Sequence, residues 1–195
     1  MKKTTWLATA ALTSLMACSV AHASPAPKDP KKHTPQELYV DAKETIEMMK
    51  KDPKVILVDV RTPEEWQFVG NTEAAQIMIP SVIFKYDQMD AKKPRYRSIN
   101  NDKFVSELED KAAELGADET STYVLMCRSG SSRAQPAAKM LWQYGYKNVY
   151  IMTDGFEGSK TKEGDKKGFR LVNGWKNSGA QWSYHIDPKK AYFYK

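Results

Sequence analysis

The chain has 195 residues, of which 41% are hydrophobic and 28% are charged, with a formal net charge of +6. This length predicts one compact domain, and the hydrophobic fraction is sufficient to bury a core. The composition is too apolar for a disordered chain, and two Cys are too few for a disulfide scaffold.

The first 23 residues have the organisation of a secretory signal peptide. A basic start precedes an apolar run over 6–16, and residues 21–23 (AHA) have the small-x-small form of a cleavage site. The apolar run is shorter than the ~20 residues that a membrane-spanning helix needs. We therefore expect residues 1–23 to be a signal peptide cleaved after Ala23, and the mature protein to be periplasmic with no membrane span. The alternative is a lipoprotein anchored through Cys18, which lies in a lipobox-like sequence.

Cleavage after Ala23 changes both the charge and the cysteine content. The mature chain would have 28 basic and 24 acidic residues among 172, a net charge of +4, which gives no support to nucleic acid as a partner. Cys127 would be the only thiol, and a lone thiol in an oxidising compartment is a liability unless it is buried or used in chemistry. Residues 24–33, rich in Pro and Lys, predict a linker before a domain over 34–195.

The first half of the domain predicts two helices and two strands. A capping box at 34–37 (TPQE) predicts a helix that runs to about Met49, and a second one at 62–65 (TPEE) predicts another, short helix. Between them, 55–58 (VILV) is a continuous, mostly β-branched apolar run, which is typical of a parallel strand buried on both faces. Residues 75–79 are a weaker strand candidate. The stretch from Ser81 to Asn101 has no clean period, and we expect a long, partly ordered connection there.

The second half predicts two more helices and two more strands. A helix over 102–115 is closed by a Gly, and its inward side chains are expected to be Phe104, Val105, Leu108, Ala112 and Leu115. A buried strand over 122–126 leads into Cys127, a helix covers 133–144, and a third strong strand covers 149–152. Strands that alternate with helices predict an α/β fold with a mainly parallel central sheet and helices on both faces.

In such a fold the functional site lies at the carboxyl ends of the strands. Two polar segments are expected there, namely 59–61 (DVR) after the strand over 55–58 and 127–133 (CRSGSSR) after the strand over 122–126. A loop of Gly and Ser can direct successive backbone N–H groups inward, and the following helix adds its positive end. Arg128 and Arg133 add full charges. These groups favour a thiolate at Cys127, which is a nucleophile without a neighbouring His base.

The other interpretation of Cys127 is a buried core thiol, which is ordinarily the commoner state of an isolated Cys. Its position at a strand end, immediately before a loop with Gly and two Arg, favours the reactive interpretation.

These segments resemble the rhodanese family of sulfurtransferases. Residues 56–65 (ILVDVRTPEE) are similar to the Asp-Val-Arg signature of that family, and residues 124–133 (VLMCRSGSSR) are similar to its active-site loop. Residues 147–158 and 173–179 are similar to its last strand and its closing Gly-Trp helix. The resemblance covers most of 34–184 and is greatest to exported single-domain members with a similar tail, so it implies a single rhodanese-like domain.

The resemblance implies a sulfurtransferase that works in two steps. The Cys127 thiolate would attack the outer sulfur of thiosulfate, or of a similar small anionic donor, and expel sulfite. Cyanide, a thiol or a protein acceptor would then take the sulfur from the Cys127 persulfide. The loop residues would hold the persulfide through their N–H groups, with the two Arg orienting the donor: Arg128, Ser129, Gly130, Ser131, Ser132 and Arg133. No metal or cofactor is implied, and the sequence has no His/Cys cluster to bind a metal.

Asp59 and Arg61 match a conserved pair of the family and would support the site. A salt bridge that merely orders the strand end is an equally good interpretation of the two residues.

Three features depart from the family pattern. Residues 71–72 (Asn-Thr) stand where the family usually has His-Ile, and Ser132 precedes Arg133 where many bacterial members have Arg before Ser. The third is an insertion at about 159–174, which follows a strand and is expected near the mouth of the site. It would shape acceptor specificity there, although its Lys-rich start indicates a solvated loop. A tail at 180–195, rich in Tyr and Trp, ends the domain.

Two other functions fit the sequence. Cys127 and Arg133 have the Cys-x5-Arg spacing of cysteine-dependent phosphatases, in which the Arg clamps a phosphate, but the loop lacks a second Gly. The second is a sulfur-carrier or binding module that acts with a partner protein. The stretch 81–101 and the tail would then form an interface, although a tail packed on its own domain is the simpler interpretation.

Overall fold

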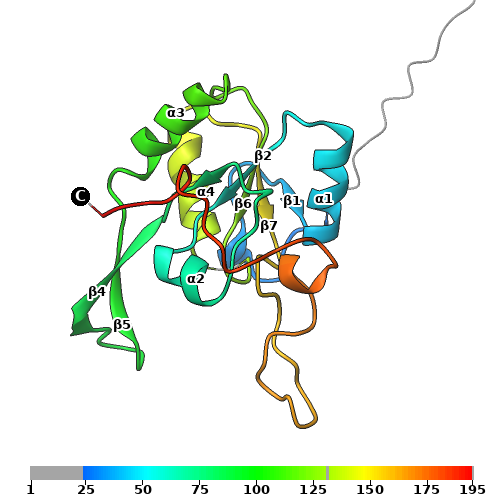
Figure 1. The fold of residues 1–195 in the computed structure, drawn as a ribbon, viewed down its shortest axis with the longest axis vertical. Coiled ribbons are helices and arrows are strands. Elements are labelled where there is room, and N and C mark those ends of the chain that lie inside the picture. The colour runs from blue at the N-terminus through cyan, green and yellow to red at the C-terminus, as the bar shows by residue number, and fades with distance from the viewer. Residues whose placement is uncertain (1–23, 131, 195) are drawn as a thin grey trace, which may run out of the picture.

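The computed structural model describes residues 24–130 and 132–194, so the predicted signal peptide at 1–23 lies outside it. A five-stranded, all-parallel sheet stands at its centre in the order β1-β7-β6-β2-β3 (Figure 1). Its strands are β1 (Tyr39–Val40), β2 (Ile56–Asp59), β3 (Ile77–Met78), β6 (Tyr123–Met126) and β7 (Val149–Met152). The helices are α1 (Ala42–Lys51), α2 (Pro63–Phe68), α3 (Phe104–Glu114) and α4 (Ala134–Gln143), with short 3-10 helices at Pro30–Lys32 and Trp175–Asn177.

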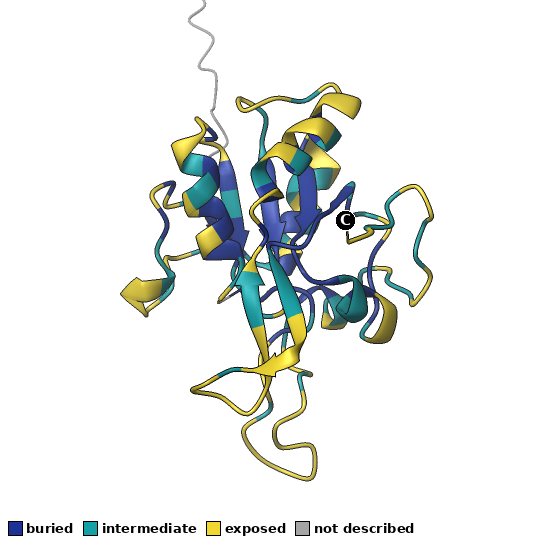
Figure 2. Cartoon of the chain, turned by 90° about the vertical axis from the view of Figure 1, so that its left-hand side faces the viewer, coloured by how far each residue is buried: buried dark blue, intermediate teal, exposed yellow. Residues whose placement is uncertain are grey.

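Helices cover both faces of the sheet, as predicted. Alternate residues of one strand enter two separate apolar clusters, because successive side chains point to opposite faces. Ile56 and Val58 of β2 pack with α3 and α4, whereas Leu57 packs with Trp66 of α2 and Ala42 of α1. The fold is therefore an α/β sandwich whose central strands are buried on both sides, which explains their unbroken apolar sequences (Figure 2).

The predicted start of the first helix is wrong. Thr34 and Glu37 form a turn, with the Glu37 N–H donating to the Thr34 carbonyl at 3.1 Å and Glu37 at a φ of 52°. The strand β1 follows and pairs with β7, and α1 begins only after Asp41. The capping box that forms joins Asp41 and Glu44. It lies directly after β1, at the point where the chain leaves the sheet and the helix can begin.

The prediction of a partly ordered connection over 81–101 is also wrong. This stretch forms an antiparallel hairpin of β4 (Val82–Met89) and β5 (Tyr96–Asn100), which projects from the body of the domain (Figure 1). Both strands are half-buried or exposed along their length, so the sequence shows no alternation of buried and exposed residues. An irregularity in the register between Lys85 and Met89 further hides the period of two.

Leu115 and the segment over 24–33 also differ from what the sequence predicts. Leu115 was expected to point inward with the rest of its helix, but it lies one residue beyond α3 and is 50% exposed. In the expected linker, His33 Nε2 lies 2.8 Å from the Pro27 carbonyl oxygen, so this segment has some local structure. The part of the chain that the structure describes contains no helix long and apolar enough to cross a membrane.

Candidate active site

The two polar segments predicted from the sequence meet at the carboxyl edge of the sheet. Asp59, the last residue of β2, is paired in register with Met126, the last residue of β6. The Val60 N–H donates to the Met126 carbonyl at 2.9 Å, which continues the pairing one residue beyond the strands. Cys127 follows directly and is almost completely buried, at 1% exposure. Adjacent parallel strands thus bring residues from distant parts of the sequence into one site.

The Cys127 loop is packed against the turn after β7. Gly130 has a φ of +61°, and a Cβ at this position would lie 2.0 Å from the Thr153 carbonyl oxygen. Gly155 has a φ of +63°, and a Cβ there would lie 2.3 Å from the Cys127 carbonyl oxygen. The Gln135 amide also holds the loop, by donating to the Gly130 carbonyl at 2.7 Å. Two glycines are therefore needed for the backbones to approach this closely.

Cys127 opens onto a cavity of about 620 Å³ at the mouth of the site. Of the predicted binding residues, the ones that line it are Arg128, Ser129, Ser132 and Arg133. Gly130 has a packing role instead, and Ser131 lies outside the described residues. The hairpin also contributes to the lining, through Val82, Phe84, Tyr86, Arg95, Tyr96 and Ser98. Glu65, Val69, Glu157 and Arg170 complete the lining.

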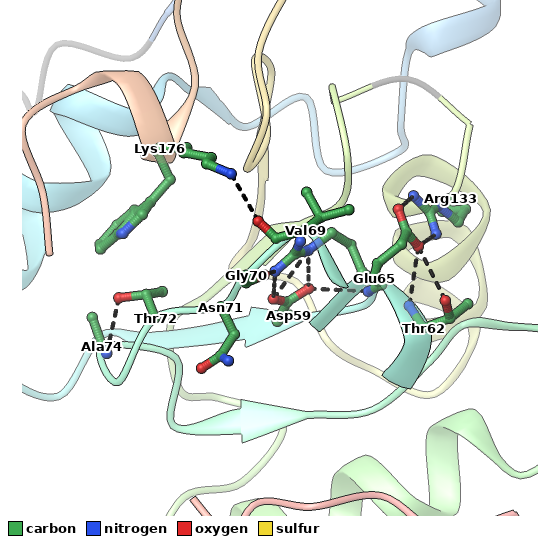
Figure 3. A network of polar contacts seen from close by, with 12 residues as sticks. Asp59, Thr62, Glu65, Val69, Gly70, Asn71, Thr72, Ala74, Arg133 and Lys176 are labelled. Atoms are coloured by element: carbon green, nitrogen blue, oxygen red, sulfur yellow. Dashed lines mark hydrogen bonds and ion pairs between the residues drawn. The ribbon is translucent and has the colours of Figure 1, made fainter. Parts of the chain in front are cut away.

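Arg133 is held by Glu65 on α2. The two guanidinium Nη atoms of Arg133 bond to the two oxygens of Glu65, with Nη2 and Oε1 2.8 Å apart (Figure 3). The same carboxylate accepts from the Thr62 N–H at 3.2 Å in the predicted capping box. Burial favours the neutral form of Glu65, but the hydrogen bonds and charge of Arg133 outweigh it and hold the Glu65 pKa below its usual value. Burial likewise opposes the charge of Arg133, and Glu65 outweighs it and raises the Arg133 pKa.

Arg128 forms a second, more open ion pair. Its Nε lies 2.7 Å from Oε1 of Glu157, and the Arg128 side chain is 51% exposed. The backbone is tied at the same place, since the Glu157 N–H donates to the Arg128 carbonyl at 2.9 Å. Both arginines that the sequence assigns to donor binding therefore line the cavity, and both already have a carboxylate partner.

Asp59 and Arg61 form an ion pair below the site rather than in its lining. Both side chains are fully buried, with Arg61 Nη2 2.6 Å from Asp59 Oδ2 and Nε 2.9 Å from Oδ1. Arg61 also donates to the Gly70 carbonyl at 2.9 Å, and its guanidinium carbon lies 3.8 Å from the centre of the Phe156 ring. These contacts fit the second of the two interpretations, a salt bridge that orders the strand end.

The departure from the family pattern at Asn71 and Thr72 coincides with the docking of the tail. Asn71 forms an antiparallel bridge with Ser183, with hydrogen bonds of 2.8 and 2.9 Å, and the Thr72 hydroxyl donates to the Gln181 carbonyl at 2.9 Å. The tail packs on its own domain here, which was the simpler of the two expectations for it.

Sequence reasoning missed several contributors to the site, among them Glu157 and Val69 in the cavity lining. Glu65 was recognised only as part of a helix cap, and its pairing with Arg133 joins residues 68 positions apart. Arg170 and the aromatic wall of the hairpin also reach the cavity through tertiary structure. The sequence offered one indication of this: the hairpin and the insertion over 159–174 both follow strands of the sheet, which places them at its carboxyl edge.

Within the described ranges, no group of three or more His, Cys, Asp or Glu side chains is positioned to hold a metal ion.

An α/β domain with a cysteine loop between a parallel strand and a helix defines the class of protein, and comparison with known proteins identifies the family. The model of the rhodanese-like domain matches residues 41–162. The "Uncharacterized protein RP600 homolog" of Rickettsia rickettsii is 30% identical over 138 residues, which cover 71% of this chain and 90% of that protein. "Uncharacterized protein RC0915" of Rickettsia conorii is 31% identical with the same coverage. The crystal structure of Rv0390 from M. tuberculosis matches with a TM-score of 0.53 and 26% identity, over 75% of this chain and 96% of that one.

The chain therefore belongs to the family of rhodanese-like domains.

Proposed function

We propose that this protein is a sulfurtransferase that moves sulfane sulfur through a persulfide on Cys127. The observation that carries the proposal is the position of Cys127, at the end of β6 and the start of the α4 loop, on a cavity lined by arginines. Arginine side chains stabilise a thiolate and attract an anionic donor such as thiosulfate. Membership of the rhodanese-like family supports a role in sulfur transfer, and the geometry supplies the residue that would perform it.

The proposed reaction is balanced without any further redox partner. The Cys127 thiolate attacks the outer sulfur of thiosulfate and forms a new S–S bond, while the S–S bond of thiosulfate breaks and sulfite leaves with the bonding electrons. A thiolate or cyanide then attacks the outer sulfur of the persulfide, and the Cys127 thiolate is released with the electron pair of the broken bond. The N–H groups at the start of α4 and the arginines favour the anions that form in both steps.

Intact mass spectrometry of the purified protein, with and without thiosulfate, tests the proposal. The expected result is the gain of one sulfur atom (~32 Da) on Cys127 and its loss after the addition of cyanide. The control is Cys127→Ser, which replaces one atom and is expected to show neither the gain nor thiocyanate formation. If Cys127→Ser still forms thiocyanate from thiosulfate and cyanide, the assignment is wrong.

The contacts of Arg133 argue against the phosphatase alternative. A phosphate clamp needs a guanidinium whose paired N–H groups face the substrate, whereas the two Nη atoms of Arg133 are bonded to Glu65. Hydrolysis of p-nitrophenyl phosphate that disappears in both Cys127→Ser and Arg133→Ala would restore this alternative.

The hairpin keeps the sulfur-carrier alternative in view. Tyr86 and Tyr96 line the cavity yet are 53% and 49% exposed, so they also offer an aromatic surface to a larger acceptor. Stable persulfide on Cys127 together with negligible turnover on cyanide and small thiols would favour a carrier that delivers its sulfur to a partner protein.

We also infer export to the periplasm with cleavage after Ala23, on the evidence of the sequence alone. The intact mass of the protein recovered from the periplasmic fraction of a bacterial host tests this directly. A mass that includes residues 1–23, or recovery only with the cytoplasm, would contradict it.

A further inference from the structure

One charged side chain of the insertion over 159–174, Arg170, lines the cavity of the site. Most of its residues between 160 and 169 are exposed, and it projects from the same edge of the sheet as the hairpin (Figures 1 and 2). Near its end, Arg170 bridges back to Lys160 and lines the cavity that contains Cys127. A solvated loop therefore accounts for the tip of the insertion but not for Arg170.

The contacts of Arg170 with the described residues include no ion pair with a carboxylate. Its Nη1 donates to the Gly158 carbonyl at 2.5 Å, and its Nε is buried without any hydrogen-bond partner. Burial, followed by the charge of Arg128, lowers the pKa of Arg170, while Glu157 and a thiolate at Cys127 act in the opposite direction. A buried donor without an acceptor carries a desolvation cost that a bound anion would relieve.

The other arginines around the cavity differ from Arg170 in this respect. Arg133 is bonded to Glu65, Arg128 to Glu157 and Arg95 to Asp90. Each of these pairs already has its positive charge balanced, so an anion that enters the cavity must compete with a carboxylate for it. Arg170 makes no such ion pair within the described part of the chain, and the carboxylate that acts on it, Glu157, is already bonded to Arg128.

We propose that Arg170 binds the anionic group of the sulfur donor, so that the insertion serves the donor step of the reaction. The inference rests on the proposed sulfurtransferase function and adds a specificity-determining residue to it. Arg170 would hold the sulfonate end of thiosulfate while the outer sulfur faces Cys127, and it would stabilise the sulfite that leaves. It differs from the sequence-based expectation, in which the insertion shapes the choice of acceptor.

The test separates the two half-reactions in Arg170→Gln. Persulfide formation on Cys127 is followed by rapid quenching and intact mass over a range of thiosulfate concentrations. We expect its kcat/KM to fall by about 10- to 100-fold, the range that a lost charge-assisted hydrogen bond corresponds to, with most of the change in KM. Discharge of preloaded persulfide by 2-mercaptoethanol is expected to stay within about 2-fold of the unmodified protein, because this acceptor has no sulfonate group for Arg170 to bind.

Three further variants distinguish binding from a structural role. Lys167→Gln removes an exposed charge from the same insertion, and Asn173→Ala removes the 2.7 Å hydrogen bond from the Ser159 N–H that anchors it. Neither side chain lines the cavity, and neither variant is expected to slow persulfide formation by more than about 2-fold. Arg170→Lys keeps the charge and is expected to recover part of the lost affinity. Thermal melting of each variant confirms that it is folded.

The proposal is overturned if folded Arg170→Gln loads sulfur as the unmodified protein does, if Asn173→Ala causes the same loss, or if the discharge step slows equally. Should Arg170→Gln not fold, Arg170→Lys decides: an unchanged KM for thiosulfate together with a lowered melting temperature would show a structural role only. Calorimetric titration of Cys127→Ser with thiosulfate, with and without Arg170→Gln, measures binding apart from chemistry. If the unmodified protein gains no sulfur but Arg170→Gln abolishes thiosulfate binding, the proposed function fails and the anion site stands.

Discussion

Two arginine–carboxylate pairs lie at the same edge of the sheet in different surroundings. The side chains of Asp59 and Arg61 are both fully buried, whereas those of Glu65 and Arg133 are 15% and 12% exposed on the wall of the cavity. Arg61 also contacts the Gly70 carbonyl and the Phe156 ring, and these contacts fix the strand end. Arg133 faces the cavity that Cys127 lines. The same pair of functional groups thus serves the fold in one place and stands beside the proposed chemistry in the other.

A third pair extends this comparison toward the solvent. Arg128 and Glu157 are 51% and 14% exposed, and they flank the cavity on the side of the insertion. Burial decides how much a broken ion pair costs, because a charge left alone in the interior cannot recover its hydration. The three pairs should therefore rank in stability from Asp59–Arg61 to Glu65–Arg133 to Arg128–Glu157.

The largest effect is expected for Asp59→Ala, which leaves the Arg61 guanidinium buried without its counter-ion. We expect the free energy of unfolding to fall by about 3–5 kcal/mol, measured by urea denaturation. In the double variant Asp59→Ala/Arg61→Met, which removes both charges, much of that loss should be recovered. A loss below about 1 kcal/mol in the single variant would show that the pair is not needed for stability.

An intermediate effect is expected for Glu65→Gln. Gln keeps the acceptor of the capping box, so the change isolates the charge that faces Arg133. We expect the free energy of unfolding to fall by about 1–3 kcal/mol, because Arg133 keeps only part of its hydrogen bonding. The same variant should alter the KM for thiosulfate, since the guanidinium becomes available to an anion. A change in stability with unaltered kinetics would place Arg133 with Arg61, as a structural residue only.

The pH dependence of stability gives a second measure of the Glu65–Arg133 pair. The pKa of Glu65 is depressed in the folded protein, so its contribution to stability is complete above the unfolded value of about 4.3. That contribution is lost as the pH falls from the pKa of Glu65 in the unfolded protein through its lower pKa in the folded protein. Denaturation at a series of pH values should show the difference between the unmodified protein and Glu65→Gln shrinking below about pH 4.3. A difference that is constant with pH would mean that the Glu65 charge is not its cause.

The smallest effect on stability is expected for Glu157→Gln, because Arg128 is well exposed and solvent screens its charge. The free energy of unfolding should change by no more than about 1 kcal/mol. Persulfide formation is the more informative readout, since the variant removes a negative charge from the cavity lining and should favour an anionic donor. Slower loading from thiosulfate in Glu157→Gln would contradict the proposed role of the positive cavity.

Local sequence patterns were sufficient to predict an element wherever its burial or its hydrogen bonds leave a mark in neighbouring residues. The continuous apolar runs predicted β2, β6 and β7, because a strand covered on both faces needs apolar side chains at every position. The capping box before α2 was recognised from four residues, because all of its hydrogen bonds are local. The first capping box failed for a non-local reason: the Gln36 amide donates to the Ala138 carbonyl at 2.8 Å, and β1 joins β7.

The hairpin and the insertion show the limit of such patterns. Neither segment is buried against the sheet over its length, so neither carries a period of buried residues. The position of both segments after strands could be predicted. Which of their side chains line the cavity depends on the tertiary structure of each segment. Arg170 is one such residue, 43 positions from Cys127 in the sequence and on the same cavity in space.

The sequence by itself determined the α/β architecture, the place of the Cys127 loop after a buried strand and the positive charge around it. These follow from burial and from residue type, which act locally. Only the tertiary structure decided the partners of Arg128 and Arg133, since Glu65 reaches Arg133 from another helix and Glu157 reaches Arg128 from another loop. A charge pattern gives the number of cations near a site, but their availability to a substrate depends on which carboxylates the fold brings beside them.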